Sequence, residues 1–361
     1  MSIDLNIQKS FKDFTLNCQL KAGNEIIGLL GSSGSGKSLT LKSIAGIVMP
    51  DQGHIIVDQR VLYDSTKNIK IPARDRKMGY LFQNYALFPR MTIMENITTC
   101  LKGTKQENIK WAKELLGEFQ LEGLGDKYPH QLSGGQQQRA AMARMMSIRP
   151  KSILLDEPFS ALDTNLKWKL ENSLGTFLRS FSGTTVLVTH NKDEAYRLCD
   201  KIAVISNGTI QEFGTKEEIF QNPKTAPAAA MLGYKNIAPL EEKKDHMEVK
   251  RWKITLPKHH FKHADDIFLW ERDFYLHEVP DSLKITGKLL NIIHDRDVDI
   301  FLLQVSDDEQ GLLTLEFPHE IPSKSDPKIL KFKEQCGKNI DVYYKWKDIR
   351  QLVDRPLKKI V

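Results

Sequence analysis

Residues 26–47 read IIGLLGSSGSGKSLTLKSIAGI, and this stretch decides the fold. The uninterrupted apolar run IIGLL predicts a buried strand, and the apolar spacing of LTLKSIAGI predicts a helix. One face of that helix would carry Leu39, Leu41, Ile44 and Ile47. A glycine-rich segment between a strand and a helix is typical of the phosphate-binding unit of α/β proteins.

This glycine-rich segment, called here the phosphate loop, fits the pattern G-x-x-x-x-G-K-[ST]. Its glycines allow backbone N–H groups to turn inward around phosphate oxygens, and the following helix adds its positive end. Lys37 would reach the terminal phosphates of a nucleotide, and Ser38 would coordinate Mg²⁺. A loop that only turns the chain is the alternative, which the flanking strand and helix disfavour. The predicted phosphate-binding residues are Gly31, Ser32, Ser33, Gly34, Ser35, Gly36, Lys37 and Ser38.

Two further buried strands are predicted where the chain reads SILLDEP and TTVLVTH. Asp156 ends the apolar part of the first, at the sheet edge where α/β proteins bind ligands, and would bind Mg²⁺ directly or through water. Glu157 is placed to polarise a water in line with the γ-phosphate. Two solvated acids at a strand end would be the alternative interpretation.

Two more polar residues follow apolar runs. His190 closes TTVLVTH at the same sheet edge and would contact the γ-phosphate, although a lone histidine is more often structural. Gln83 follows the run YLF and would touch the metal or the attacking water; a surface glutamine is the alternative.

The chain's 361 residues suggest two or three domains. Strand-to-helix units predict a mainly parallel α/β sheet over residues 1–235, with a mostly helical part at about 84–150. Residues 236–361 predict a small all-β domain. Its strand candidates are WKITL, DIFLW, LKITGKLLNII, DIFLLQV, GLLTLEF and NIDVYYKW.

Composition excludes several classes of protein. The net charge of +6 permits attraction to an anionic membrane surface or nucleic acid, but a solvated surface is the favoured explanation. Four scattered cysteines without a CxxC pair indicate reduced thiols and not a disulfide framework or metal site. The N-terminus lacks a signal-peptide core, and no apolar run approaches the ~20 residues of a membrane span. We therefore expect a cytoplasmic chain.

Six motifs resemble, in kind and order, those of ATP-binding cassette ATPases: GSSGSGKS, LFQN, LSGGQ, ILLDEP, SALD and the histidine after TTVLVT. The resemblance covers roughly residues 1–235 and implies an ATPase that uses ATP and Mg²⁺. It also implies that two copies meet head to tail, with the LSGGQ of one pressing on the ATP of the other. Ser133, Gly134, Gly135 and Gln136 would then bind that γ-phosphate in trans. An N-capped helix start is the alternative for LSGGQ alone.

The resemblance carries further roles. Asp163 in SALD would lie at the dimer interface. Phe11 would stack on adenine, with Phe14 as the alternative. The surface near Gln83–Pro89 would dock on integral-membrane permease subunits, which receive substrate from an external binding protein. The chain would then be peripheral on the inner face of the cell membrane.

Residues 61–97 resemble importers of oxyanions, the molybdate ATPases most and the sulfate ATPases next; ferric-iron and sugar importers share much of this stretch. This importer group carries an oligonucleotide/oligosaccharide-fold-like (TOBE-type) module at the C-terminus, and ITGKLLNII resembles the first strand of that module. Lys284, Thr286 and Lys288 alternate along it and are candidates for binding an oxyanion. Because VPDSLK replaces the usual Ser-Ala-Arg-Asn lead-in, a dimer-stabilising role is an equal alternative.

Cassette ATPases that act on DNA or ribosomes form a different class. Repair types insert a long coiled coil before LSGGQ, and translation types carry two cassettes in one chain. This chain shows neither sustained heptads nor a second cassette, so the sequence favours a transport-coupled ATPase.

Overall fold

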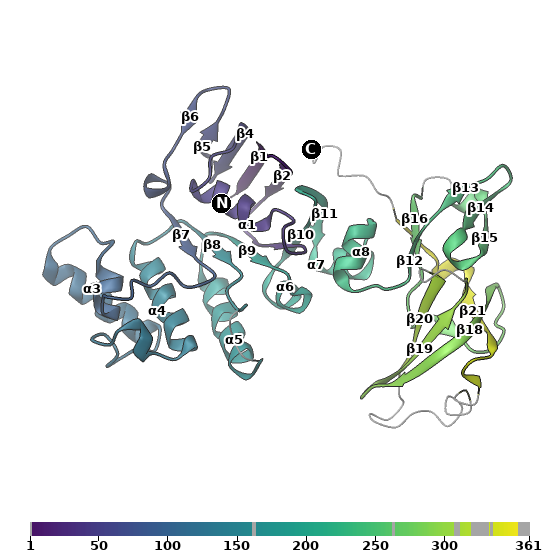
Figure 1. The fold of residues 1–361 in the computed structure, drawn as a ribbon. Helices are drawn as coiled ribbons and strands as arrows, with labels where there is room; N and C mark the ends of the chain where they lie inside the picture. The colour runs from purple at the N-terminus through teal and green to yellow at the C-terminus, as the bar shows by residue number, and fades with distance from the viewer. Residues whose placement is uncertain are drawn as a thin grey trace. The chain divides into compact units, whose positions relative to one another are not determined.

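The computed structural model describes residues 2–160, 164–261, 264–306, 311–318, 332 and 335–352. The chain divides into two compact units, one up to Ile219 and one beginning at Phe220 (Figure 1). The boundary expected at residue 235 falls inside the second unit. Helix α8 (Ala226–Leu232) belongs to that unit because its Ala229 packs with Phe268 and Leu352.

An eleven-stranded mixed sheet forms the first unit, in the order β6-β5-β4-β1-β2-β11-β10-β3-β9-β8-β7. Five neighbouring strands are parallel: β10 (Lys201–Ser206), β3 (Ile26–Leu30), β9 (Thr184–Thr189), β8 (Ser152–Asp156) and β7 (Met78–Leu81). The other six are β1 (Ile3–Ser10), β2 (Thr15–Ala22), β4 (Gln52–Val57), β5 (Arg60–Asp64), β6 (Ile69–Lys70) and β11 (Thr209–Thr215).

The expectation of a mainly parallel sheet is therefore wrong for five of its ten strand pairings, the other five being parallel. β1, β2 and β4 to β6 pair as antiparallel neighbours, as do β10 and β11. Their burial alternates along β1 and β2, as in sheets with one covered face, whereas β3, β8 and β9 are buried throughout. The three fully buried strands β3, β8 and β9 lead into the phosphate loop, the Asp156–Glu157 pair and His190, respectively.

Helix α1 (Lys37–Ala45) follows the phosphate loop directly. Leu41 and Ile44 are buried as expected, but Ile47 lies beyond the helix and is 48% exposed. Gly46 ends α1 in the left-handed conformation, with φ 78°, which glycine adopts without strain. The prediction that these apolar residues share one helix face is therefore wrong for Ile47, because the helix ends before that residue.

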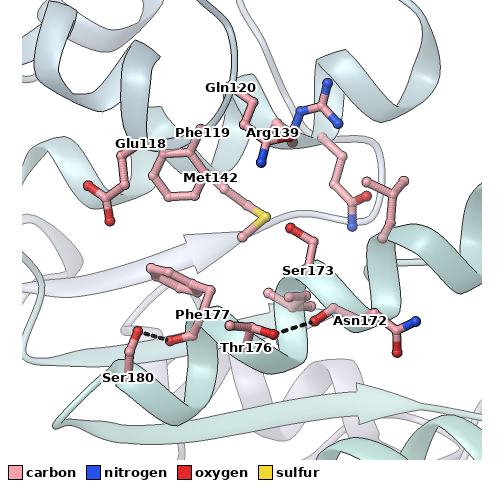
Figure 2. A pocket seen from close by; sticks show the side chains of 13 residues that line it. Glu118, Phe119, Gln120, Arg139, Met142, Asn172, Ser173, Thr176, Phe177 and Ser180 are labelled. Atoms are coloured by element: carbon pink, nitrogen blue, oxygen red, sulfur yellow. Dashed lines mark hydrogen bonds between the residues drawn. The ribbon is translucent and has the colours of Figure 1, made fainter.

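The helical part contains α2 (Ile93–Thr98), α3 (Lys105–Glu118) and α4 (Gly134–Ser147). Each begins with a capping box, in which a Thr or Ser side chain and a Glu or Gln side chain satisfy each other's backbone N–H groups. Strand β7 lies just before the stretch of about 84–150 that was expected to be mostly helical. A cavity of about 490 Å³ lies between α3, α4 and α5 (Thr164–Ser180) (Figure 2).

The remaining helices of the first unit's sequence are α6 (Lys192–Leu198) and α7 (Lys216–Gln221), which spans the division between units. Among the described residues, no helix has the length and apolar character needed to cross a membrane.

The second unit holds three small sheets in its described residues, ordered β12-β16-β22, β13-β14-β15 and β17-β21-β18-β19-β20. Their strands pack around a core that includes Trp252, Phe301 and Tyr344. The first two sheets comprise β12 (Ile237–Pro239), β16 (Asp266–Phe268), β22 (Arg350–Leu352), β13 (Glu241–Glu242), β14 (His246–Val249) and β15 (Ile254–Pro257). The third comprises β17 (Phe274–Tyr275), β21 (Asn339–Lys345), β18 (Ser282–His294), β19 (Val298–Gln304) and β20 (Leu312–Pro318). All six strand candidates from the sequence contain strands.

Candidate nucleotide site

The phosphate loop runs from the end of β3 to the start of α1. Gly34 and Gly36 have φ values of 79° and 106°, a conformation that L side chains rarely adopt, so glycine is required at both positions. The Ser35 hydroxyl is buried and has no hydrogen-bond partner among the described residues. A buried polar group without a partner is costly, and a phosphate oxygen in the loop would satisfy it.

Lys37 is the first residue of α1 and is only 4% exposed. Its Nζ donates to the carbonyl of Ser32 at 2.7 Å, so the ammonium lies back across the loop. Burial lowers the pKa of Lys37, and the negative charges of Glu157 and Asp156 offset part of that effect. A phosphate bound in the loop would compensate the buried positive charge.

Asp156 ends β8, and both of its carboxylate oxygens accept hydrogen bonds. The Ser38 hydroxyl donates to Oδ1 at 2.7 Å, and the Tyr80 hydroxyl donates to Oδ2 at 2.8 Å. Burial, and next the charge of Asp156, raise the pKa of Tyr80. The Ser38 hydroxyl and the Asp156 carboxylate are hard oxygen donors of the kind that Mg²⁺ prefers, so this pair fits the ion.

Sequence analysis missed Tyr80. It lies on β7, the strand beside β8, and faces Leu154 in the register. The available signal was a tyrosine within an otherwise apolar strand, because a buried phenolic hydroxyl requires a partner.

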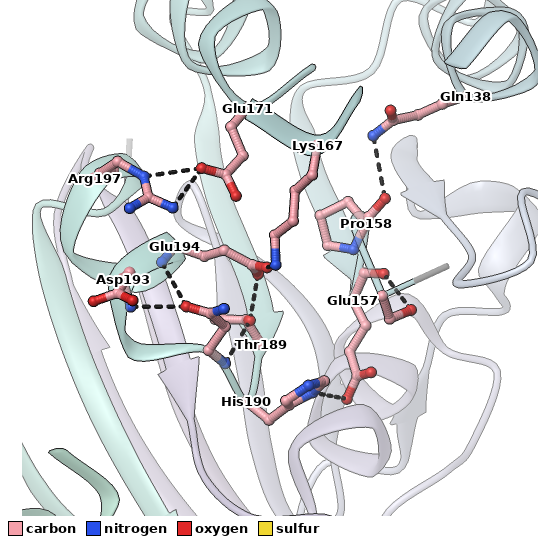
Figure 3. Close-up of polar contacts among 12 residues, drawn as sticks. Gln138, Glu157, Pro158, Lys167, Glu171, Thr189, His190, Asp193, Glu194 and Arg197 are labelled. Atoms are coloured by element: carbon pink, nitrogen blue, oxygen red, sulfur yellow. Dashed lines mark hydrogen bonds and ion pairs between the residues drawn. The ribbon is translucent and has the colours of Figure 1, made fainter. Parts of the chain in front are cut away.

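Glu157 has a left-handed backbone, with φ 45°, which is uncommon for a residue with a side chain. Its N–H donates to Val188 O on β9 at 3.0 Å, and its carbonyl accepts from the Ser160 hydroxyl at 3.1 Å. Gln83 Nε2 donates to Glu157 Oε2 at 3.3 Å. On the other side, His190 Nδ1 lies 3.4 Å from Glu157 Oε1, a contact that Figure 3 shows. The structure thus brings together the three residues that sequence analysis assigned to the chemistry.

His190 follows β9, and its side chain is about half exposed. Polar contacts that sequence analysis missed hold the adjacent end of β9 in place (Figure 3). Thr189 Oγ1 donates to Glu194 Oε2 at 2.5 Å, and Glu194 forms an ion pair with Lys167 of α5. These contacts fix the backbone from which His190 projects. The sequence signal was limited to an acid, Glu194, shortly after TTVLVTH; that it is buried is known only from the structure.

The signature segment, Leu132–Gln136, begins helix α4. Ser133 is the N-cap: its hydroxyl accepts from Gln136 N at 3.3 Å, and its N–H donates to Gln136 Oε1 at 2.9 Å. Ser133 and Gly134 are exposed, whereas Gly135 is buried. Among the described residues, no hydrogen bond or ion pair joins this segment to the phosphate loop of the same chain.

The aromatic candidates differ in surroundings. Phe11 is 48% exposed, with the Lys9 ammonium 5.8 Å from its ring centre. Phe14 is partly buried against the core, and its ring lies beside Gly36. Adenine stacking by Phe11 stays a prediction, and Asp163 lies outside the described residues.

The chain is similar in sequence to known proteins of one family. The family model described as "ABC transporter" matches residues 14–160. The sulfate/thiosulfate import ATP-binding protein CysA of Synechocystis is 38% identical over 309 residues, which cover 81% of this chain and 82% of the relative. The chain belongs to the ABC transporter ATPase family. It is a transport-coupled enzyme that hydrolyses ATP.

Other ABC proteins extend the comparison. CysA 2 of Agrobacterium fabrum, a sulfate/thiosulfate import ATP-binding protein, is 40% identical over 240 residues, covering 64% of this chain and 68% of its own. The solved dimeric cassette MJ0796, bound to ADP and Pi after hydrolysis, matches with TM-score 0.51 and 29% identity. That match covers 60% of this chain and 99% of the cassette. The import ATPases named here are sulfate/thiosulfate proteins, so they do not support the preference for molybdate drawn from residues 61–97.

Proposed function

We propose that this ABC transporter ATPase powers the import of sulfate or thiosulfate. The observation that carries the proposal is the 38% identity to the Synechocystis sulfate/thiosulfate import protein, because the match reaches beyond the cassette to 81% of the chain. Sulfate was the second choice from the sequence, and the relatives favour it over molybdate, ferric iron or a sugar.

The proposed reaction is hydrolysis of ATP held by the phosphate loop. Lys37 and the loop N–H groups neutralise the terminal phosphates, and Ser38, Asp156 and Gln83 supply oxygens for Mg²⁺. When bound, that ion withdraws charge from the phosphate oxygens. Glu157 orients a water in line with the γ-phosphate and accepts its proton.

His190 and Gln83 support this role of Glu157. His190 Nδ1 lies 3.4 Å from one carboxylate oxygen, and Gln83 Nε2 lies 3.3 Å from the other. Two contacts on opposite oxygens restrict rotation of the carboxylate, which holds it toward the phosphate site. We assign His190 the further role of contacting the γ-phosphate.

The proposed working form is a head-to-tail pair of chains. Support comes from the exposed Ser133 and Gly134 at a helix start, a natural seat for phosphate, and from the dimeric state of the related MJ0796 cassette. Ser133, Gly134, Gly135 and Gln136 then bind the γ-phosphate of the partner's ATP. Permease subunits in the membrane and an external binding protein complete the importer, with this chain on the inner face of the membrane.

For the second unit we propose a structural, dimer-stabilising role as an oligonucleotide/oligosaccharide-fold-like module. Lys284, Thr286 and Lys288 do lie on one exposed face of β18. However, Lys284 Nζ lies 2.7 Å from Asp341 Oδ2, and the Thr286 hydroxyl donates to Asp341 Oδ1 at 2.7 Å. These contacts lower the pKa of Asp341, so a carboxylate already occupies the place an oxyanion would take.

The test isolates the chain from membranes with the permease and binding protein that accompany it. ATP hydrolysis of the reconstituted complex is then measured with sulfate, thiosulfate or molybdate outside the vesicle, and Lys37→Ala serves as the inactive control. Stimulation by sulfate or thiosulfate is expected. Stimulation by molybdate alone would overturn the substrate, and recovery with ribosomes or DNA would overturn the transport role.

A further inference from the structure

Gln138 links the signature helix to the catalytic turn of the same chain. It lies on α4, five residues after the N-cap Ser133, and is 1% exposed. Its Nε2 donates to the carbonyl of Pro158 at 3.2 Å, and Pro158 directly follows Glu157 (Figure 3). A carbonyl can only accept, so the amide nitrogen must be the atom that faces Pro158.

The turn that Gln138 holds is strained. The left-handed backbone of Glu157 persists only where its surroundings over-determine it. Val188 on β9 fixes one side through the Glu157 N–H, and Ser160 closes the turn from within. Gln138 supplies a contact from helix α4. The position of this helix therefore affects the geometry of Glu157, the proposed catalytic base.

A cavity beside Gln138 separates part of α4 from α5. Gln138 lines the cavity of about 490 Å³ between α3, α4 and α5, together with Arg139 and Met142 of its own helix (Figure 2). Phe177 of α5 lies on the opposite wall. Gln138 faces this cavity on one side and Pro158 on the other, so its hydrogen bond is a discrete link between α4 and the Glu157 turn.

We propose that Gln138 is a positioning residue through which the seating of the signature segment controls Glu157. Ser133 and Gln138 lie on one helix, so a displacement of its start by the partner's nucleotide moves Pro158 and the Glu157 backbone with it. Each chain would then hydrolyse its own ATP efficiently only when its signature segment is engaged. This inference rests on the proposed head-to-tail dimer.

Replacement of Gln138 by methionine is the primary test, because it preserves length and burial but removes the donor. The kcat for ATP should fall about tenfold, the scale of one lost hydrogen bond, while KM stays within about twofold. ATP-dependent dimerisation in a Glu157→Gln background should persist. Met142→Leu alters the same cavity wall without touching the link and should retain the parental kcat.

A parental kcat in Gln138→Met would overturn the positioning role. Failure of Glu157→Gln to dimerise with ATP would instead overturn the composite site. If the melting temperature of Gln138→Met is well below that of Met142→Leu, the Gln138→Glu variant tests the positioning role instead. Its carboxylate cannot donate to Pro158, but the protonated carboxyl can, so its kcat relative to the parent should recover as pH falls. A ratio that does not change with pH would contradict the proposal.

Discussion

The hydroxyl of Ser38 donates to Oδ1 of Asp156 over 2.7 Å and joins the phosphate loop to the end of β8. Two oxygens suited to one Mg²⁺ are thereby held in contact before any nucleotide binds. Tyr80 engages the other carboxylate oxygen at 2.8 Å, so Asp156 is oriented from both sides.

Asp156→Asn should raise the Mg²⁺ concentration for half-maximal ATP hydrolysis by at least about tenfold, because a charged ligand is replaced by a neutral one. Tyr80→Phe removes only the orienting hydrogen bond and should cause a smaller shift. Magnesium titrations of both variants measure the effect. A parental titration curve for Asp156→Asn would contradict the assignment.

Glu157→Gln should retain ATP binding and lower turnover by roughly 10²–10⁴-fold, the scale of a positioned base. Lys37→Ala should instead weaken nucleotide binding itself, because it removes the buried charge that faces the phosphates. Equilibrium binding and steady-state hydrolysis separate these two effects. Hydrolysis at the parental rate in Glu157→Gln would rule out Glu157 as the base.

With ATP, Glu157→Gln should accumulate dimers, because the nucleotide joins two chains and is not consumed. Adding Ser133→Arg should abolish the dimer by placing bulk and charge against the partner's nucleotide. Binding of ATP to the monomer should remain nearly intact. Light scattering with and without ATP measures the assembly, and a double variant that still dimerises would refute the trans arrangement.

The affinity for ATP should decrease at alkaline pH. Burial places the pKa of Lys37 below its ordinary value of 10.5, and a bound phosphate favours the charged form. Affinity is therefore complete below the lowered pKa and is lost as pH rises through it. Lys37→Arg stays charged over this range, so its affinity should not follow that decline. Equal pH profiles for the two proteins would exclude Lys37 as the titrating group.

The face of β18 should not bind oxyanions. In a Lys37→Ala background, which disables the phosphate loop, calorimetric titration with sulfate or molybdate should give no saturable heat. Asp341→Asn removes the competing carboxylate and should allow only weak binding. Saturable molybdate heat that disappears on Lys284→Ala would show that this face is a sensor after all.

Much of the site was predictable because its residues stand at the ends of apolar runs. Asp156, Glu157 and His190 each follow a buried strand, and adjacent parallel strands bring such ends to one sheet edge. The proximity of these three residues to Gln83 could be predicted without knowledge of side-chain contacts. The same reasoning places the phosphate loop directly after β3, with Lys37 and Ser38 at the start of α1.

Other features depend on partners distant in sequence and carry little local signal. Tyr80 and Gln138 act through single hydrogen bonds from β7 and α4, and any tyrosine or glutamine could occupy such positions. The antiparallel pairing of β4, β5 and β6 beside β1 was missed because strand periodicity does not specify the direction or the neighbours of a strand. The prediction that Ile47 lies on the helix face was wrong because the apolar periodicity continues past Gly46, where the backbone ends the helix.

The capping box at Ser133 has a consequence for how the two chains close. In this structure the Ser133 hydroxyl accepts from Gln136 N, so its own proton can still be donated. In the proposed dimer, an oxygen of the partner's γ-phosphate would accept that proton without displacing the cap, which is worth about 1 kcal/mol in typical helices. The cap would thus preorganise the donor: the serine is held in its binding geometry before the second chain arrives.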